Sequence, residues 1–479
     1  MCSGRGGNNR EPAGTTGRAW PAAGRQYAGT QRHEEVPITH RPRPGQEAGI
    51  PQLDGPAVAA DPRTVARTAA SSWALDPAVT FLNHGSFGAC PRAVLEAQRR
   101  WRERMEAEPV RFLALDLERL LDSARERLAS FVGAAADDLA FVSNATAGVN
   151  TVLRSLRFAP GDELLTTDHE YNASLNALRF AAARDGARVV VARVPFPIAD
   201  PGEAVAAVLA AVTPRTRLAL LDHVTSPTAL VLPIGELVGE LAGRGVDTLI
   251  DGAHGPGMVP LGLDALGAAY YTGNCHKWLC APKGSAFLHV RGDRQDGIRP
   301  PAISHGANSR RSDASRFRVE FDWTGTADPT AWLSVPDAID AVGAMAAEGW
   351  PGIMAANHAL VIEARDVLCD ALGVEPPVPD GMLGSMATVP LPVVGGPTRE
   401  QGDRALALES ALRERGFEVP IIPWPSPWLM DSGDLPASTP GGLAVRVSAQ
   451  RYNRRGHFEA LAGALVELAG ALVELAPRA

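Results

Sequence analysis

The sequence predicts an α/β protein with a mainly parallel sheet flanked by helices, followed by a smaller C-terminal α+β domain. Between residues 139 and 290, short apolar runs alternate with segments of helical periodicity. This pattern is typical of a parallel sheet covered by helices on both faces. Beyond about residue 345, longer helical runs are separated by a few β-like pieces. In a sheet of the first kind, ligands bind at the carboxyl ends of the strands.

The elements follow in order along the chain. A short strand and a glycine-rich turn are predicted over 81–91, and helical spacing over 94–131 is interrupted at Pro109, which predicts two helices. Strands of the sheet are predicted at 139–142, 163–166, 188–194, 218–222, 248–250, 269–272 and 286–290. Helices between them are predicted at 172–185, 202–212 and 234–244.

The domain boundaries come from changes in the same patterns. We predict a large domain over 71–345 and a small domain over 346–479. The small domain contains helical runs at 355–372, at 404–415 and from residue 457, and β-like pieces near 387–394 and 443–448. Residues 1–70 are rich in Gly, Arg and Ala and lack periodicity, which predicts a disordered extension or a misassigned start codon, rather than a functional arm.

The composition narrows the class of function. A net charge of −8 without a basic stripe disfavours a nucleic-acid partner. The chain contains no apolar run of the roughly 18 residues that a membrane helix needs, so no membrane partner is expected. The five cysteines are widely spaced and form no Cys-x-x-Cys pair, which favours a cytoplasmic location and disfavours a thiolate zinc site.

Lysine is scarce in this chain. Only two of the 46 basic residues are lysines, Lys277 and Lys283. Lys277 follows the predicted strand 269–272 and stands among apolar residues, a setting that lowers the pKa of an amine and favours Schiff-base chemistry. The alternative is a structural or surface lysine. Lys283 lies in a Pro-Lys-Gly turn, which favours a solvated role.

Two further motifs end predicted strands. Asp251 follows the apolar strand 248–250, and a carboxylate there needs a cationic or donor partner. A protonated pyridine nitrogen is one candidate for this partner. Alternatively, Asp251 could cap the following turn or bind a metal together with His254. The metal site is disfavoured because no further metal ligand is spaced nearby. The run SNATAGVN (143–150) precedes a helix, whose free N–H groups could bind a phosphate, although Asn144 or Thr146 could simply be an N-cap. The sequence has neither a Walker A motif nor G-x-G-x-x-G.

Six motifs together resemble the class V aminotransferase superfamily of pyridoxal 5′-phosphate (PLP) enzymes, which have fold type I. In order they are SNATAGVN, TTDHEYNA (166–173), DHVTSPT (222–228), DGAHGPG (251–257), GNCHKW (273–278) and AVRVSAQRYN (444–453). The runs LNHGSFGACP (82–91) and HVTSPTALVLP (223–233) resemble isopenicillin N epimerase and its relatives more than the cysteine desulfurases. The resemblance covers about residues 73–470.

The resemblance implies specific contacts to the cofactor. Lys277 would form the internal aldimine, Asp251 would pair with the pyridine nitrogen, and His254 would approach the phenolic oxygen. The ring-stacking residue would come from DHEY (168–171), with His169 favoured over Tyr171.

The resemblance also implies how the phosphate is bound. Ala145 and Thr146 would hold it, and Asn274 and His276 would add contacts. The run 321–334 resembles the segment by which a neighbouring subunit reaches the phosphate, and its candidates are Gly325 and Thr326. This implies a homodimer with shared active sites.

The substrate side is implied by the same resemblance. Arg446 matches the family's substrate-carboxylate arginine, and a bidentate guanidinium suits a planar carboxylate; a structural salt bridge is the alternative. Asn83 and His84 would line the substrate side or shape the entry turn. We therefore expect a small amino-acid-type substrate.

The reaction itself stays open at this stage. With Lys277 as the base that removes the Cα proton of an external aldimine, a proton returned to the opposite face of Cα gives epimerisation, and loss of a β-substituent gives elimination. Epimerisation like that of isopenicillin N epimerase is favoured, with C–S lyase or aminotransferase activity as alternatives. A desulfurase is disfavoured because the late Cys369 lies in a helical run, and a non-catalytic relative would be expected to lack Lys277 or Asp251.

Overall fold

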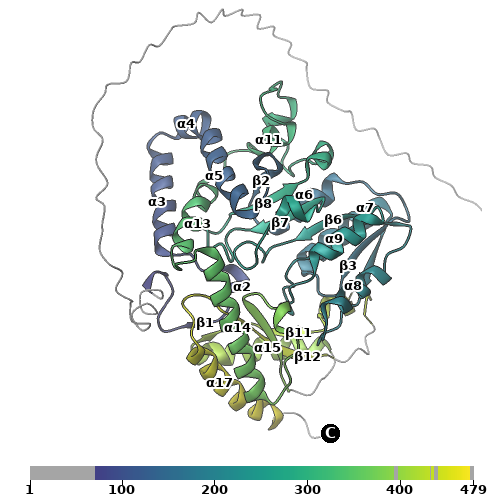
Figure 1. Ribbon diagram of the computed structural model, residues 1–479, viewed down its shortest axis with the longest axis vertical. Helices are drawn as coiled ribbons and strands as arrows, with labels where there is room; N and C mark the ends of the chain where they lie inside the picture. The colour runs from purple at the N-terminus through teal and green to yellow at the C-terminus, as the bar shows by residue number, and fades with distance from the viewer. Residues whose placement is uncertain (1–70, 393–397, 432, 436–440, 475–479) are drawn as a thin grey trace, which may run out of the picture. The chain divides into compact units, whose positions relative to one another are not determined.

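The computed structural model describes residues 71–392, 398–431, 433–435 and 441–474. The predicted extension at 1–70 lies outside them. All described residues belong to one compact unit, Ala60–Ala479. Its central sheet (Figure 1) has seven strands in the order β2-β8-β7-β6-β5-β3-β4, and β8 alone runs opposite to the other six.

The seven strands lie where the sequence predicts them. They are β2 (Leu139–Val142), β3 (Glu163–Thr167), β4 (Arg188–Ala192), β5 (Thr216–Asp222), β6 (Asp247–Asp251), β7 (Tyr270–Asn274) and β8 (Ala286–Val290). Successive side chains enter different hydrophobic clusters: in β5, Leu218 and Leu220 join one cluster, and Ala219 and Leu221 join the other. Because both faces are covered, the strands are apolar at nearly every position.

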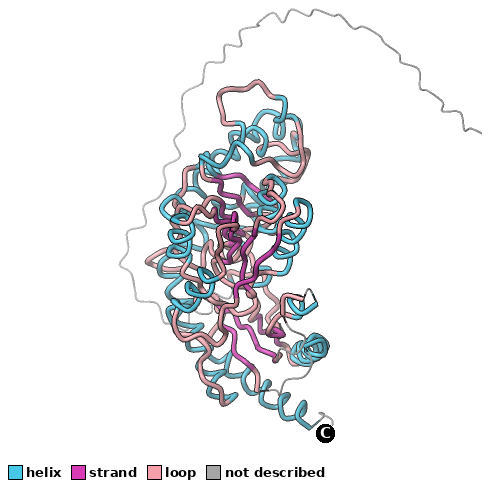
Figure 2. The backbone as a smooth tube through the Cα atoms, turned by 90° about the vertical axis from the view of Figure 1, so that its right-hand side faces the viewer, coloured by secondary structure: helices cyan, strands magenta, loops and turns pink. Residues whose placement is uncertain are grey.

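Helices cover both faces of this sheet, as Figure 2 shows in an edge-on view. Side chains of α6 (Ala145–Ser155), α7 (Asn172–Asp185) and α11 (Arg316–Phe321) pack in one cluster. Side chains of α5 (Leu117–Val132), α8 (Pro201–Ala210), α9 (Ile234–Gly243) and α13 (Val335–Gly343) pack in the other. The predicted fold class is therefore confirmed.

The break predicted at Pro109 is present. The helix α3 (Arg92–Ala107) ends before it, and a new helical stretch begins at Pro109 with α4 (Pro109–Arg111), continues as a π-helical turn (Phe112–Asp116) and leads into α5. Proline suits the first position of a helix because it has no N–H to leave unpaired there.

A second, antiparallel sheet has the order β11-β12-β9 and packs with α14 and α15, and α17 packs on α14. Its elements are β9 (Met386–Pro390), β11 (Ile421–Trp424), β12 (Gly442–Ser448), α14 (Trp350–Leu372), α15 (Thr398–Glu414) and α17 (Arg455–Glu474). The strand β1 (Thr80–Phe81) pairs in parallel with β10 (Phe417–Glu418), so the start of the described chain joins its C-terminal part. The sequence did not predict β10 or β11, and the domain boundary at 346 stays a prediction.

Shorter helices complete the described elements. They are α2 (His84–Phe87), α10 (Leu263–Leu266), α12 (Thr330–Leu333) and α16 (Pro427–Asp431), with 3-10 turns at Ala136–Asp138, Gly292–Gly297, His305–Asn308 and Asp380–Met382. Among the helices that the structure describes, none has the length and apolar character required to cross a bilayer.

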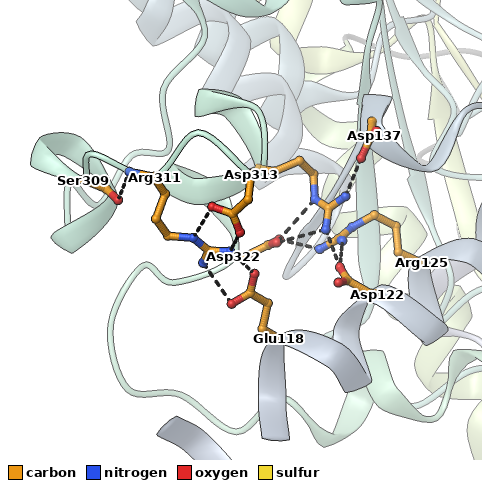
Figure 3. Close-up of polar contacts among 9 residues, drawn as sticks. Glu118, Asp122, Arg125, Asp137, Ser309, Arg311, Asp313 and Asp322 are labelled. Atoms are coloured by element: carbon orange, nitrogen blue, oxygen red, sulfur yellow. Dashed lines mark hydrogen bonds and ion pairs between the residues drawn. The ribbon is translucent and has the colours of Figure 1, made fainter. Parts of the chain in front are cut away.

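Ion pairs join α5 to the segment around α11 (Figure 3). We call this group the arginine cluster; it consists of Arg125, Arg311, Arg318, Glu118, Asp122, Asp137, Asp313 and Asp322. Arg125 Nη1 donates to Asp122 Oδ1 at 2.7 Å, and Arg318 Nη1 donates to Asp137 Oδ1 at 2.7 Å. Each guanidinium of the cluster therefore faces carboxylates.

Candidate active site

A cavity of about 360 Å³ opens at the carboxyl ends of β6 and β7, beside the N-terminus of α6. Seven of the residues predicted for the site line this cavity: Lys277, Asp251, His254, Ala145, Thr146, Asn274 and His276. The structure thus brings together residues from two strand ends and one helix, which is where a parallel sheet is expected to bind its ligand.

Lys277 follows β7 and lies 3.2 Å from His254, measured from Nζ to Nε2. The Trp278 indole N–H donates to the other ring nitrogen of His254, Nδ1, at 3.2 Å, so that nitrogen carries no proton. Burial holds the pKa of His254 well below its usual range, so the ring is neutral and its single proton lies on Nε2. The Lys277 amine must then accept a hydrogen bond from His254 Nε2–H, and only an unprotonated amine has the lone pair to accept it.

The electrostatics of the cavity also favour a free amine. Burial first, and then the nearby Arg446 charge, lower the pKa of Lys277 to about 8, against the opposing effect of Asp251 and Asp222. About a tenth of the Lys277 amine is therefore unprotonated at pH 7, far more than for an ordinary lysine with a pKa of about 10.4, and only this form is nucleophilic.

Asp251 ends β6 and is almost fully buried. Its Oδ2 accepts from the Ser174 hydroxyl at 2.7 Å and its Oδ1 accepts from the Ala253 amide at 3.0 Å. Burial raises the pKa of Asp251, although these two hydrogen bonds oppose the effect. The carboxylate is thus held in one orientation, and no cationic side chain among the described residues forms an ion pair with it.

The N-terminus of α6 forms another wall of the cavity. Asn144 caps the helix, and its side chain accepts from the Ala147 amide at 2.8 Å. The Ala145 amide donates to Asn274 Oδ1 at 2.8 Å, so Asn274 ties α6 to the end of β7. His276 Nδ1 donates to the Ser285 carbonyl at 2.8 Å, which leaves its Nε2 on the cavity side. These contacts orient the amide end of α6 toward the cavity, where an anion is favoured.

The residue expected to stack on the ring is placed differently from the prediction. His169 is fully buried and does not line the cavity; its Nε2 donates to the Val194 carbonyl at 2.9 Å and its Nδ1 accepts from Thr228 at 2.6 Å. The ring packs against Trp424, with centroids 4.4 Å apart. Tyr171 is 47% exposed and lines the cavity. The structure therefore brings Tyr171, and not His169, to the cavity wall.

Arg446 extends from β12 and lies directly behind the cavity wall rather than on it. Its Nη1 donates to the Ser226 carbonyl at 2.5 Å, and its Nη2 donates to the Ser86 hydroxyl at 3.0 Å and to Asn83 Oδ1 at 3.5 Å. Both serines line the cavity. Burial lowers the pKa of Arg446 to about 10, and among the described residues no carboxylate forms an ion pair with it.

Four other predicted residues do not reach the cavity. Asn83 contacts Arg446 from behind the wall, and His84 is fully buried, where its Nε2 donates to the Lys277 carbonyl at 3.1 Å. Thr326 lines a separate groove of about 650 Å³, and Gly325 precedes it. His84 thus supports the backbone of the lysine, and Gly325 and Thr326 stand apart from the site within one chain.

Sequence reasoning missed some residues of the cavity. Asp222 and Ser226 line it, and neither received a role although both lie in the DHVTSPT motif. Asp222 ends an apolar strand just as Asp251 does, and this signal could have identified it. Lys283 was expected to be solvated; it is exposed, and its Nζ donates to the Gly88 carbonyl at 2.6 Å.

One cavity of this mainly parallel sheet is lined by a buried lysine, a strand-end aspartate and a helix N-terminus, an arrangement typical of α/β enzymes. The chain belongs to the class V aminotransferase family, whose model matches residues 82–375. Isopenicillin N epimerase of Amycolatopsis lactamdurans is 37% identical over 420 residues, 83% of this chain and 99% of that protein.

Two other comparisons extend this result. Putative L-cysteine desulfhydrase 1 of Oryza sativa subsp. japonica is 33% identical over 407 residues, 81% of this chain and 82% of that protein. The solved structure of a C-DES mutant with glycine covalently linked to the PLP cofactor has a TM-score of 0.64 at 21% identity, and covers 81% of this chain and 96% of that one.

The comparisons confirm the predicted family, the PLP dependence that characterises it, and the prediction of an enzyme. The relatives include both epimerases and desulfhydrases, so they establish an enzyme of this family without selecting one reaction. The roles of the individual site residues, the homodimer and the cytoplasmic location stay predictions.

Proposed function

We propose that this protein acts at the α-carbon of an amino acid or amino-acid-derived substrate, and that its reaction is an epimerisation like that of isopenicillin N epimerase. The observation that carries the proposal is the free Lys277 amine, which accepts a hydrogen bond from His254 inside a cavity with carboxylates and a helix N-terminus on its walls. The bound cofactor supplies an electron sink that stabilises a carbanion at Cα.

The residues present fit this cofactor. Lys277 would hold its aldehyde carbon covalently, and Asp251 would accept from its protonated ring nitrogen. Thr146 and the amide end of α6 would bind its phosphate. Tyr171, because it lines the cavity, replaces His169 as the residue that we place against the ring face.

Arg446 would bind the substrate carboxylate. Ser86 and Ser226 separate the guanidinium from the cavity, and a carboxylate that enters between them would replace these neutral acceptors. Hydrogen bonds between charged partners are stronger than those to neutral acceptors, so the exchange is favourable. A substrate fixed in this way keeps its Cα–H bond within reach of Lys277, which removes the proton.

β-Elimination is the second candidate, because a relative of nearly equal identity is a putative L-cysteine desulfhydrase. A desulfurase is disfavoured by the position of Cys369, which is buried within α14. Burial raises the pKa of this thiol to about 11, so it would be a poor nucleophile.

We also propose that two copies form a homodimer, in which Gly325 and Thr326 of each would reach the phosphate of the other. The groove that contains Thr326 is also lined by Val110 and Leu115, which are 78% and 76% exposed. Large exposed apolar side chains are typical of interfaces. Light scattering of the purified protein measures the molar mass, and a monomeric mass would exclude this arrangement.

Reduction with borohydride tests the cofactor assignment. Peptide mass spectrometry should find the reduced cofactor on Lys277, and a protein that takes up no PLP would refute the proposal. Incubation with candidate amino acids in deuterated water then separates the reactions. Deuterium at Cα with inversion supports epimerisation, whereas release of pyruvate and ammonia from cysteine would establish elimination.

A further inference from the structure

Three carboxylates meet beneath the cavity. Asp222, Asp251 and Glu170 are all buried, and one oxygen of each lies within 4.8 Å of the other two. Asp222 and Asp251 end the neighbouring parallel strands β5 and β6, where they face each other in register. Glu170 enters from the turn between β3 and α7. We call these three residues the carboxylate triad.

The members of the triad differ in their partners. Asp251 accepts from Ser174 and Ala253, and Glu170 accepts from the Tyr171 amide at 3.1 Å and from Thr166 at 3.3 Å. Asp222 Oδ2 is buried without a hydrogen-bond partner in the part of the chain that the structure describes. Asp222 is only 3% exposed and lines the cavity. An unpaired buried oxygen is costly, so its position at the cavity indicates a missing donor.

The triad cannot be fully charged. Burial raises the pKa of Asp222 well above its usual range, and the charges of Glu170 and Asp251 raise it further, against the effect of Lys277. Burial and then Asp251 likewise raise the pKa of Glu170. Lys277 is the cation that faces the triad, and the buried Tyr271 hydroxyl lies near Asp251. Closely spaced carboxylates of this kind share protons.

We propose that Asp222 is a positioning residue that acts through Asp251: it shares a proton within the triad, passes that proton to the cofactor's ring nitrogen on binding, and then keeps the nitrogen protonated by its negative charge. This inference rests on the proposed function. It goes beyond the single contact between Asp251 and the ring nitrogen, because it assigns the source of the proton and a second negative charge.

The transfer is balanced within the site. One O–H bond of the triad breaks and one N–H bond forms at the ring nitrogen, so a neutral carboxyl and a neutral pyridine become a carboxylate and a pyridinium. Neither an oxidant nor a proton from solvent is needed. The pyridinium N–H then supplies the hydrogen-bond donor that the triad lacks. Two nearby carboxylates stabilise the charged form of the ring nitrogen more than a single carboxylate does.

The test uses holoenzyme loaded with 15N-labelled PLP. The 15N chemical shift of the ring reports its protonation, and a pH titration gives the midpoint. In Asp222→Asn the midpoint should fall by about 1 pH unit, a tenfold change in the protonation equilibrium, because an opposite charge within a few ångströms shifts a pKa by roughly 1–3 units. Glu170→Gln should shift it in the same direction. Asp247→Asn, at the other end of β6, is the matched control and should not shift it.

Proton uptake provides a second measurement if the midpoint of the ring-nitrogen titration lies outside the accessible pH range. When PLP is added to apoprotein in weak buffer, Asp222→Asn should take up more protons from solution than wild type, because the triad supplies fewer. The inference would be overturned if the Asp222 and Glu170 variants bound PLP and showed the same midpoint and the same proton uptake as wild type. A chelator that alters the wild-type midpoint would do so as well, since it would identify a metal ion as the partner of the triad. Failure of wild type to load PLP on Lys277 would instead refute the proposed function.

Discussion

The buried arginines of this protein have two different kinds of partner. In the arginine cluster, Arg125 and Arg318 share Asp122 and Asp322, and both guanidinium groups are at most 10% exposed (Figure 3). Behind the cavity wall, Arg446 is equally buried but donates to a carbonyl, a hydroxyl and an amide oxygen. The charges of the cluster are neutralised within the chain. The guanidinium of Arg446 is held by neutral acceptors, and no carboxylate in the described part of the chain forms an ion pair with it.

This difference indicates what each group contributes. A buried charge that is paired within the chain maintains structure, and removal of one member reduces the compensation of its partners. A buried charge bound only by neutral groups retains its capacity to bind an ion of opposite sign. Substitutions in the cluster should therefore affect stability, and substitutions in the cavity should affect binding and chemistry.

The largest effect is expected from Lys277→Ala. Loss of the amine removes both the covalent attachment and the base, so kcat should fall at least about 1,000-fold, since a positioned base alone contributes roughly 100- to 10,000-fold. Borohydride should then trap no cofactor on the chain. Lys283→Arg is the matched control, because the exposed Lys283 only donates to the Gly88 carbonyl. Equal activity in both variants would contradict this assignment.

The comparison itself is tested by the pair Arg446→Met and Arg318→Met. Arg446→Met should lower kcat/KM about 100-fold, because a hydrogen bond to a charged group contributes roughly 1.5–3 kcal/mol. Arg318→Met should instead destabilise the fold by about 1.5–3 kcal/mol, since it removes a charged hydrogen bond to the largely buried Asp322. Asp322 keeps Arg125 as a second partner, which limits the loss. Urea unfolding and steady-state kinetics of both variants measure the two effects. If both variants lost activity and stability alike, the two groups would not differ as we describe.

The pH dependence of cofactor capture is the next effect in size. Since only the free amine attacks an aldehyde, and the pKa of Lys277 is lowered to about 8, the rate of PLP attachment should fall about tenfold for each pH unit below that value. Stopped-flow absorbance measures this rate. The Arg446 charge contributes to the lowered pKa, so the midpoint of Arg446→Met should lie at higher pH. An unchanged midpoint would show that Arg446 does not act on the amine.

The smallest effect concerns the apoprotein. Because the pKa of Asp222 is raised in the folded state, its contribution to stability is present in acid and is lost as the pH rises through that pKa. Asp222→Asn removes this loss, so the variant should be more stable than wild type at neutral pH, by about 1 kcal/mol for each unit of the shift. Thermal unfolding at several pH values should show the difference vanish in acid. If the variant were less stable than wild type at neutral pH, the charged Asp222 side chain would not destabilise the apoprotein as we expect.

Much of the fold could be predicted from sequence because the strands of the central sheet are buried on both faces and therefore appear as apolar runs. β10 and β11 were missed because they contain only two and four residues, and β11 also includes Pro423, so neither forms such a run. Lys277, Asp251 and His254 could be placed at the site since each follows a predicted strand.

The choice between His169 and Tyr171 could not be made in this way. They lie two residues apart in one turn, and the backbone path of that turn decides which side chain enters the cavity. Asp222 ends an apolar strand, but its meeting with Asp251 depends on β5 and β6 being neighbours in the sheet. The spatial order of strands in a sheet cannot be deduced from their order along the chain.

The pairing of β1 with β10 has a consequence for the order of assembly. The Ser448 amide also donates to the Leu82 carbonyl at 2.9 Å, so residues next to Ser86 are attached to β12, the strand of Arg446. These contacts join segments near the two ends of the described chain, and contacts so distant in sequence form late, after nearly all of the chain has been synthesised. The lysine side of the cavity depends on strands that are complete by residue 290, whereas the arginine side requires the C-terminal segment. During synthesis, the part of the cavity that contains Lys277 would therefore form before the part that depends on Arg446.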